Sequence, residues 1–197
     1  MNAVRLCCLL LSAASVAATA VAAPAEPPAS SQTPPQTQAQ PAADPGVLVG
    51  PVTREQIEAA CPEWVRSEVE AAPDAAAAQA LASVPPGAEV TVFLGTWCGD
   101  SRREVPRLWK ALDAAGGTVP FHVRYVGVDR QKKEPAGEAG ASGIEFVPTF
   151  IVSREGQELG RIVELPLHGV EKDLLALLTG EAHGVVSASH AESLTPH

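Results

Sequence analysis

Hydrophobic and polar positions in the second half of the chain follow two different periods. Four runs rich in apolar and β-branched residues predict strands, at 89–94, 121–129, 147–152 and 158–164. Two amphipathic stretches with helical spacing, each followed by glycine, predict helices at 101–115 and 169–178. A turn at Arg154–Gln157 joins the last two strands into a hairpin. This order of elements predicts an α/β fold, a mixed sheet of about four strands flanked by helices.

A helical extension is predicted ahead of this domain, at residues 51–87. Apolar residues recur at helical spacing after Thr53, which is a candidate N-cap with a glutamine three residues later. Pro62 interrupts the pattern and is expected to kink or restart the helix. An alanine-rich stretch that begins at Asp74 predicts a further helix. Residues 181–197 are polar and predict a flexible tail.

Residues 1–23 have the layout of a secretory signal peptide. Arg5 precedes the apolar run Leu6–Leu11, and an alanine-rich stretch with A-x-A cleavage patterns follows. An uncleaved membrane anchor is the alternative, although Ala, Ser and Thr dilute the second half of the stretch. Cleavage would export the protein to the periplasm or the extracellular space and leave no membrane span in the mature chain. Residues 24–50 are rich in Pro, Ala and Gln and predict an extended linker.

The composition narrows the class of partner. The chain has 197 residues, and 46% of them are hydrophobic, which is enough apolar surface for a folded core. Its net charge is −9 and it has no basic stripe, so we expect no nucleic-acid partner. Removal of residues 1–23 would leave two cysteines, Cys61 and Cys98. Because an oxidising compartment does not favour free thiols, both are candidates for redox chemistry.

The turn Trp97–Ser101 lies where a predicted strand passes into a predicted helix. Cys98 in this turn would sit at the helix N-terminus, where unpaired backbone N–H groups and the helix dipole stabilise a thiolate. Ser101 could point its hydroxyl at the same sulfur, whereas the negative charge of Asp100 would oppose the thiolate. The alternative is that Cys98 is a small buried hydrophobe. The strand–turn–helix context favours a reactive thiol, with Cys98 and Ser101 as the catalytic candidates.

This turn resembles the active-site turn of the thioredoxin superfamily, W-C-x-x-C. Pro106 lies where thioredoxin-like proteins commonly kink the following helix, and Val147-Pro148-Thr149 resembles the family's cis-proline loop. The sequence TWCGDSRREVP also resembles the corresponding segment in a group of exported bacterial thioredoxin-like proteins. The resemblance implies that residues 88–180 form a thioredoxin-like domain. It also implies binding residues around the nucleophile, namely Trp97, Gly99, Asp100, Val147 and Pro148.

Two departures from the family pattern alter the expected chemistry. Ser101 stands where the family has its second cysteine, so a dithiol cycle within the motif is excluded, and Val92 replaces a buried acid that the family often has. Three alternatives are open. Cys98 could act as a monothiol in disulfide isomerisation or de-glutathionylation, Cys61 could be its resolving cysteine, or the domain could be a non-catalytic module that binds extended peptides through Pro148. The expected partner is a disulfide- or thiol-containing client protein or a small thiol, with no metal and no cofactor.

Overall fold

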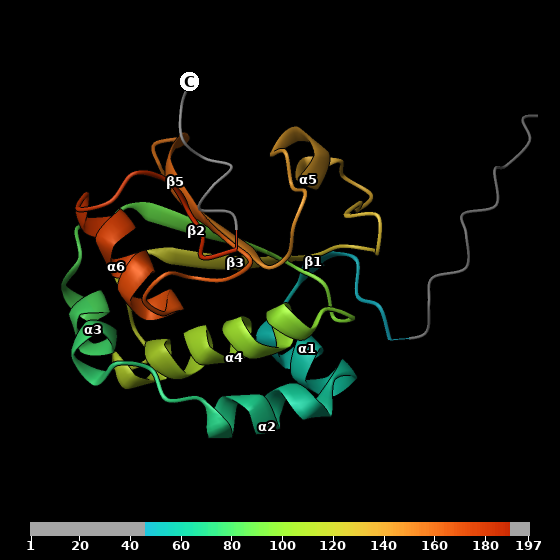
Figure 1. Cartoon of the computed structure of the whole chain (residues 1–197), viewed down its shortest axis with the longest axis horizontal. Helices are drawn as coiled ribbons and strands as arrows, with labels where there is room; N and C mark the ends of the chain where they lie inside the picture. The colour runs from blue at the N-terminus through green and yellow to red at the C-terminus, as the bar shows by residue number, and fades with distance from the viewer. Residues whose placement is uncertain (1–45, 190–197) are drawn as a thin grey trace, which may run out of the picture. The chain divides into compact units, whose positions relative to one another are not determined.

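The computed structural model describes residues 46–189 of the chain. The predicted signal peptide at 1–23, the linker up to residue 45 and the tail beyond residue 189 lie outside the described residues. All described residues belong to one unit of the chain, Gln40–His197. Their architecture is mixed α/β, a six-stranded mixed sheet flanked by helices (Figure 1).

The sheet has the strand order β1-β3-β2-β4-β5-β6. Its strands are β1 (Gly50–Val52), β2 (Ala88–Leu94), β3 (His122–Gly127), β4 (Thr149–Arg154), β5 (Gln157–Val163) and β6 (Gly184–Val186). β2 runs parallel to β3 and antiparallel to β4, which forms the predicted hairpin with β5. The outer strands differ in direction, because β1 is antiparallel to β3 whereas β6 is parallel to β5.

The prediction of about four strands was too low, because both outer strands are only three residues long. β1 pairs with β3 so that Gly50 lies opposite Gly127, and β6 pairs with β5 so that Gly184 lies opposite Gly160. β1 falls at the boundary between the predicted linker and the helical extension, and β6 falls in the predicted tail. A strand of three residues has no readable alternation, and its place depends on a partner distant in sequence.

Helices lie at α1 (Arg54–Ala60), α2 (Pro62–Glu70), α3 (Ala75–Ala80), α4 (Gly99–Ala114), α5 (Glu138–Ala141) and α6 (Val170–Thr179), with a 3₁₀ turn at Leu81–Ser83. Thr53 closes a capping box at the start of α1, and Asp74 caps α3 by accepting a hydrogen bond from the Ala77 N–H. Pro62 is the first residue of α2, where its missing N–H costs no helical hydrogen bond. Within residues 46–189, no helix is both long and apolar enough to cross a bilayer.

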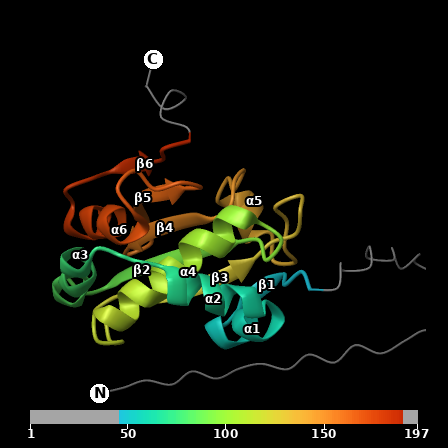
Figure 2. The same cartoon turned by 60° about the horizontal axis from the view of Figure 1, so that its bottom comes forward.

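Apolar side chains cover both faces of the sheet. On one face, Val92 of β2 belongs to the main core together with Leu108 of α4 and Leu174 of α6. Figure 2 shows α4 lying across the sheet between α2 and α6. On the other face, Phe93 of β2 packs in a smaller cluster with Ala139 of α5. The buried face of α4 therefore fixes this helix on the sheet, and its N-terminus stands at the end of β2.

Three aromatic rings join the helical extension to α4. The ring centroid of Trp64 in α2 lies 5.9 Å from that of Trp109 in α4, and Trp109 lies 6.2 Å from Tyr125 of β3. The guanidinium carbon of Arg54 lies 5.1 Å from the Trp109 ring centroid. Burial raises the pKa of Tyr125 to about 12, so its hydroxyl stays neutral. The extension thus packs against the helix that follows Cys98.

Candidate functional site

Cys98 lies in the turn that connects β2 to α4. Its N–H donates to the Gly95 carbonyl at 2.9 Å, which closes the turn, and its own carbonyl accepts from the Arg102 N–H at 3.1 Å, which begins the helix. Cys98 is the N-cap residue of α4 in extended conformation, and its side chain makes no capping hydrogen bond. The half-buried sulfur therefore stands at the end of a helix whose first N–H groups have no intrahelical acceptor.

The loop before β4 supplies the nearest polar partner of this thiol. The Val147–Pro148 peptide bond is cis, as the resemblance to the thioredoxin superfamily implied. The Cys98 thiol donates a hydrogen bond to the Val147 carbonyl oxygen at 3.1 Å. The carbonyl of Pro148 accepts from the Glu164 N–H at 2.8 Å, which ties the loop to the end of β5. The structure thus brings together Cys98 and Val147, which lie 49 positions apart in the sequence.

Trp97 packs across the inner side of the same turn. Its indole Nε1 donates to the Val128 carbonyl at 3.0 Å, and the Arg130 guanidinium carbon lies 5.4 Å from its ring centroid. The ring lies against Gly95, since a Cβ atom built at Gly95 would come within 2.6 Å of the indole Cε2. Trp97 therefore links the turn at Cys98 to the segment that follows β3.

Gly95→Ala is expected to displace this indole ring and lower the free energy of unfolding by about 1–3 kcal/mol, the usual cost of overpacking. Urea denaturation followed by circular dichroism measures the change. Gly99→Ala is the matched control, because a Cβ atom at Gly99 meets nothing within 4 Å. Equal unfolding free energies for the two variants would contradict the packing of Trp97 on Gly95.

Ser101 is fully buried, and its hydroxyl oxygen accepts a hydrogen bond from the Gly95 N–H at 3.2 Å. A hydrogen bond from Ser101 to the sulfur of Cys98 is not found among the residues that the structure describes. Ser101 thus holds the turn from inside, and its role as a donor to the thiolate stays a prediction. The sequence could not reveal this partner, because it depends on how the turn closes.

Two of the charged residues that follow Cys98, Asp100 and Arg103, are paired with each other. Asp100, which follows the exposed Gly99, accepts a hydrogen bond from Nη2 of Arg103 at 2.8 Å. Nε of the same arginine lies 2.7 Å from the buried carboxylate of Glu104. Arg103 therefore offsets the negative charge of Asp100, which the sequence analysis set against the thiolate.

Cys61 occupies a different environment. It ends α1, begins α2 and packs in the main core beside Ile57 and Trp64, with 5% of its surface exposed. Burial raises the pKa of the Cys61 thiol, and the Glu63 carboxylate raises it further. Cys61 also contributes to the lining of an open hollow of about 430 Å³, which Trp97 lines too. Both described cysteines are free thiols, so the resolving role of Cys61 stays a prediction.

Thr96 is a member of this region that the sequence analysis did not single out. Its buried hydroxyl donates to the Gly46 carbonyl at 2.9 Å and accepts from the Leu48 N–H at 3.3 Å. The segment before β1 is therefore fastened to the turn that carries Cys98. The polar character of this residue, between Gly95 and Trp97, indicated that it needs a hydrogen-bond partner. The sequence could not identify the partners, because they lie some fifty positions away.

Comparisons with known proteins give no family. No protein-family model and no curated protein matches the chain. Among solved structures, a protein of unknown function from Pseudomonas aeruginosa is 16% identical, with 66% of this chain and 99% of that chain covered and a TM-score of 0.49. An HIV epitope scaffold is 18% identical, with 61% of this chain and 85% of that chain covered and a TM-score of 0.48.

Proposed function

We propose that this protein is a thioredoxin-like thiol–disulfide exchange protein that uses Cys98 as its single nucleophile. The observation that carries the proposal is the position of one thiol at the N-terminus of α4, 3.1 Å from the Val147 carbonyl beside cis-Pro148. Support for a thioredoxin-like fold comes from the order of β2, α4, β3, the β4–β5 hairpin and α6, which is the order of that superfamily. The predicted signal peptide supports a periplasmic or extracellular setting.

Two parts of the fold lie against the sulfur. The Val147 carbonyl accepts a hydrogen bond from the S–H group at 3.1 Å, which fixes the position of the sulfur. The first N–H groups of α4 have no intrahelical acceptor, and they carry the positive end of the helix dipole. These N–H groups offer donors to the negative charge that the sulfur carries when it attacks a disulfide.

The exchange step needs one thiolate and one disulfide. The Cys98 thiolate attacks a sulfur of the substrate disulfide, a mixed disulfide with Cys98 forms, and the other substrate sulfur leaves as a thiolate. A second thiolate, from the client or from a small thiol, then attacks the mixed disulfide and releases Cys98. Ser101 cannot perform this second attack, so in the proposed monothiol cycle the client or the small thiol supplies the resolving thiol. Isomerisation and de-glutathionylation are the two reactions of this form.

Incubation with glutathione disulfide followed by peptide mass spectrometry tests the proposal. We expect one glutathione adduct, on the peptide that contains Cys98, and its removal when a small thiol is added. An adduct on Cys61 alone would contradict the assignment of the nucleophile. Absence of any adduct, together with binding of an extended peptide that Pro148→Ala abolishes, would favour the non-catalytic binding module instead.

A further inference from the structure

We propose that an open hollow beside the first turns of α4 binds the carboxylate of an anionic disulfide substrate, and that Arg102 recognises this carboxylate. The inference rests on the proposed function, because it names the substrate class of the exchange at Cys98. The hollow measures about 350 Å³. Three arginines of α4 line one wall, and the opposite wall is formed by Ser67, Glu70 and Ala71 at the end of α2.

Arg102 is within reach of a substrate bound at the sulfur. It follows Cys98 by four positions, and its N–H donates to the Cys98 carbonyl at 3.1 Å. This hydrogen bond closes the first turn of α4, so the side chain of Arg102 leaves the helix one turn beyond Cys98. The side chain is exposed and lines the hollow.

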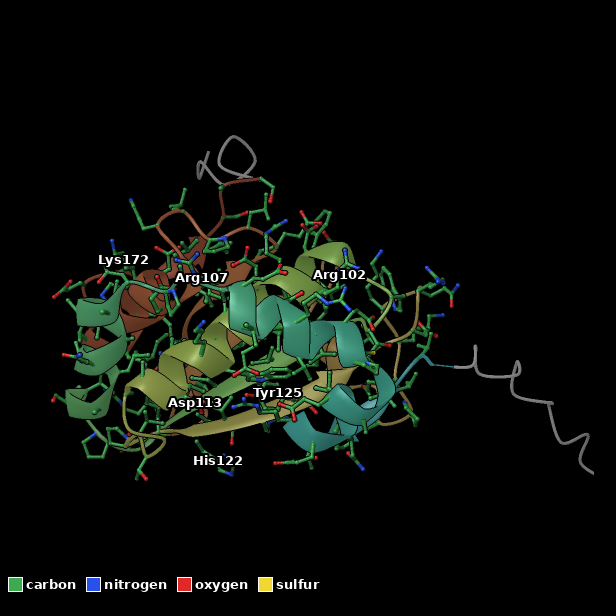
Figure 3. All side chains as sticks on the ribbon, turned by 90° about the horizontal axis from the view of Figure 1, so that it is seen from below. Arg102, Arg107, Asp113, His122, Tyr125 and Lys172 are labelled. Carbon is green, nitrogen blue, oxygen red and sulfur yellow. The ribbon has the colours of Figure 1, made fainter. Side chains whose placement is uncertain are left out.

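The side chain of Arg102 has no ion pair or hydrogen bond among residues 46–189. The other two arginines are already engaged, because Arg103 binds two carboxylates and Arg107 binds Glu171 through Nε and Nη2. Figure 3 shows the labelled side chains of Arg102 and Arg107 beside α2. Arg102 is thus the arginine of this wall with all five N–H donors open to a ligand.

The negative charge of the protein as a whole makes the guanidinium of Arg102 important for attracting an anionic substrate. The chain carries a net charge of −9, so a substrate anion is repelled by the molecule as a whole. Glu70 on the opposite wall adds to that repulsion, which places the bound carboxylate against α4. A guanidinium offers two parallel N–H groups that match a carboxylate, which a lysine ammonium does not. Arg102 therefore selects a carboxylate-bearing disulfide over neutral or cationic ones.

Rates of mixed-disulfide formation with three small disulfides test this selection. They are dithiodipropionate, which is anionic, hydroxyethyl disulfide, which is neutral, and cystamine, which is cationic. At low salt we expect Arg102→Gln to lower the ratio of the anionic to the neutral rate about five-fold relative to wild type. The ratio of the cationic to the neutral rate should not fall. Because the leaving thiols of the three disulfides differ in pKa, the comparison is between wild type and variant and not between the disulfides themselves. Because the same sulfur attacks each disulfide, the ratio cancels any change in the reactivity of Cys98.

Arg66→Gln is the matched control, because Arg66 is an exposed arginine of α2 and its loss changes the net charge equally. It should leave the ratio of anionic to neutral rates unchanged. An anionic-to-neutral ratio that Arg102→Gln leaves unchanged, or an equal loss in both variants, overturns the inference and leaves the proposed function standing. Reaction with none of the three disulfides overturns the proposed function.

Alkylation of Cys98 by iodoacetate and by iodoacetamide compares an anionic with a neutral reagent without any disulfide. The two reagents differ chiefly in that iodoacetate has a charged carboxylate where iodoacetamide has a neutral amide. We expect Arg102→Gln to slow the iodoacetate reaction about three- to five-fold relative to the iodoacetamide reaction. An unchanged ratio of the two rates would show that Arg102 does not attract a carboxylate to this sulfur.

Discussion

Cys98→Ala is expected to reduce disulfide exchange to the uncatalysed background rate. The variant keeps Val147, Pro148 and the N-terminus of α4 but lacks the sulfur that lies between them. We expect that Cys61 does not replace it, because this residue is only 5% exposed and burial raises the pKa of its thiol. Reduction of a glutathione mixed disulfide on a model peptide, followed at neutral pH with excess glutathione, measures the loss.

Cys61→Ala is the matched control for this variant. It removes the other thiol of the described chain, and the proposal requires it to retain the wild-type exchange rate. A small loss of stability of about 1 kcal/mol is expected, because Cys61 packs in the main core. If both variants lose activity, Cys61 is the resolving cysteine and the monothiol mechanism is wrong. If neither loses activity, the assigned nucleophile is wrong.

The placement of Cys98 at the end of a strand was predictable from local pattern. The apolar run 89–94 and the amphipathic helix after it each extend over enough residues to show their period, so the turn between them could be located. The contact between Val147 and Cys98 could not be predicted from local pattern. Forty-nine positions separate the two residues, and the resemblance to a known family, not the pattern, placed them together.

Contacts that depend on three-dimensional closure could not be predicted. The hydroxyl of the buried Ser101 accepts a hydrogen bond from the Gly95 N–H, a contact that the sequence did not predict. Thr96 binds a segment that the sequence predicted as linker. Such polar contacts produce no periodic pattern in the sequence, since a single residue on each side is enough to form them. The ion pair between Arg107 of α4 and Glu171 of α6 could not be predicted for the same reason.

Arg107→Met is expected to lower the free energy of unfolding by about 3–5 kcal/mol at neutral pH, the usual cost of leaving a buried charge unpaired. Glu171 of α6 is fully buried, and its two carboxylate oxygens accept hydrogen bonds from Nε and Nη2 of Arg107 at 2.9 and 2.8 Å. The Asp74 N–H also donates to Glu171, at 2.9 Å. Removing the guanidinium leaves that carboxylate with the backbone N–H and without a counter-charge.

The loss should depend on pH in a defined direction. Burial alone would raise the pKa of Glu171, but the hydrogen bonds from Arg107 and from the Asp74 N–H outweigh it and hold this pKa below its usual value. A carboxyl with a lowered folded pKa stabilises the fold above its unfolded pKa, and that stability is lost as pH falls through the folded pKa. In Arg107→Met the pKa of Glu171 rises, so protonation relieves the unpaired charge. The deficit relative to wild type should therefore shrink between about pH 7 and about pH 4.

Urea denaturation at the two pH values measures this difference, with Arg66→Met as the control for loss of an exposed arginine. Arg66→Met should lower the free energy of unfolding by less than about 0.5 kcal/mol at either pH, as surface substitutions do. The double variant Arg107→Met with Glu171→Met should recover most of the stability, since two apolar side chains of similar volume replace the pair. A deficit that is the same at both pH values, or a double variant as unstable as Arg107→Met, would show that the arginine acts through packing and not by compensating the buried charge of Glu171.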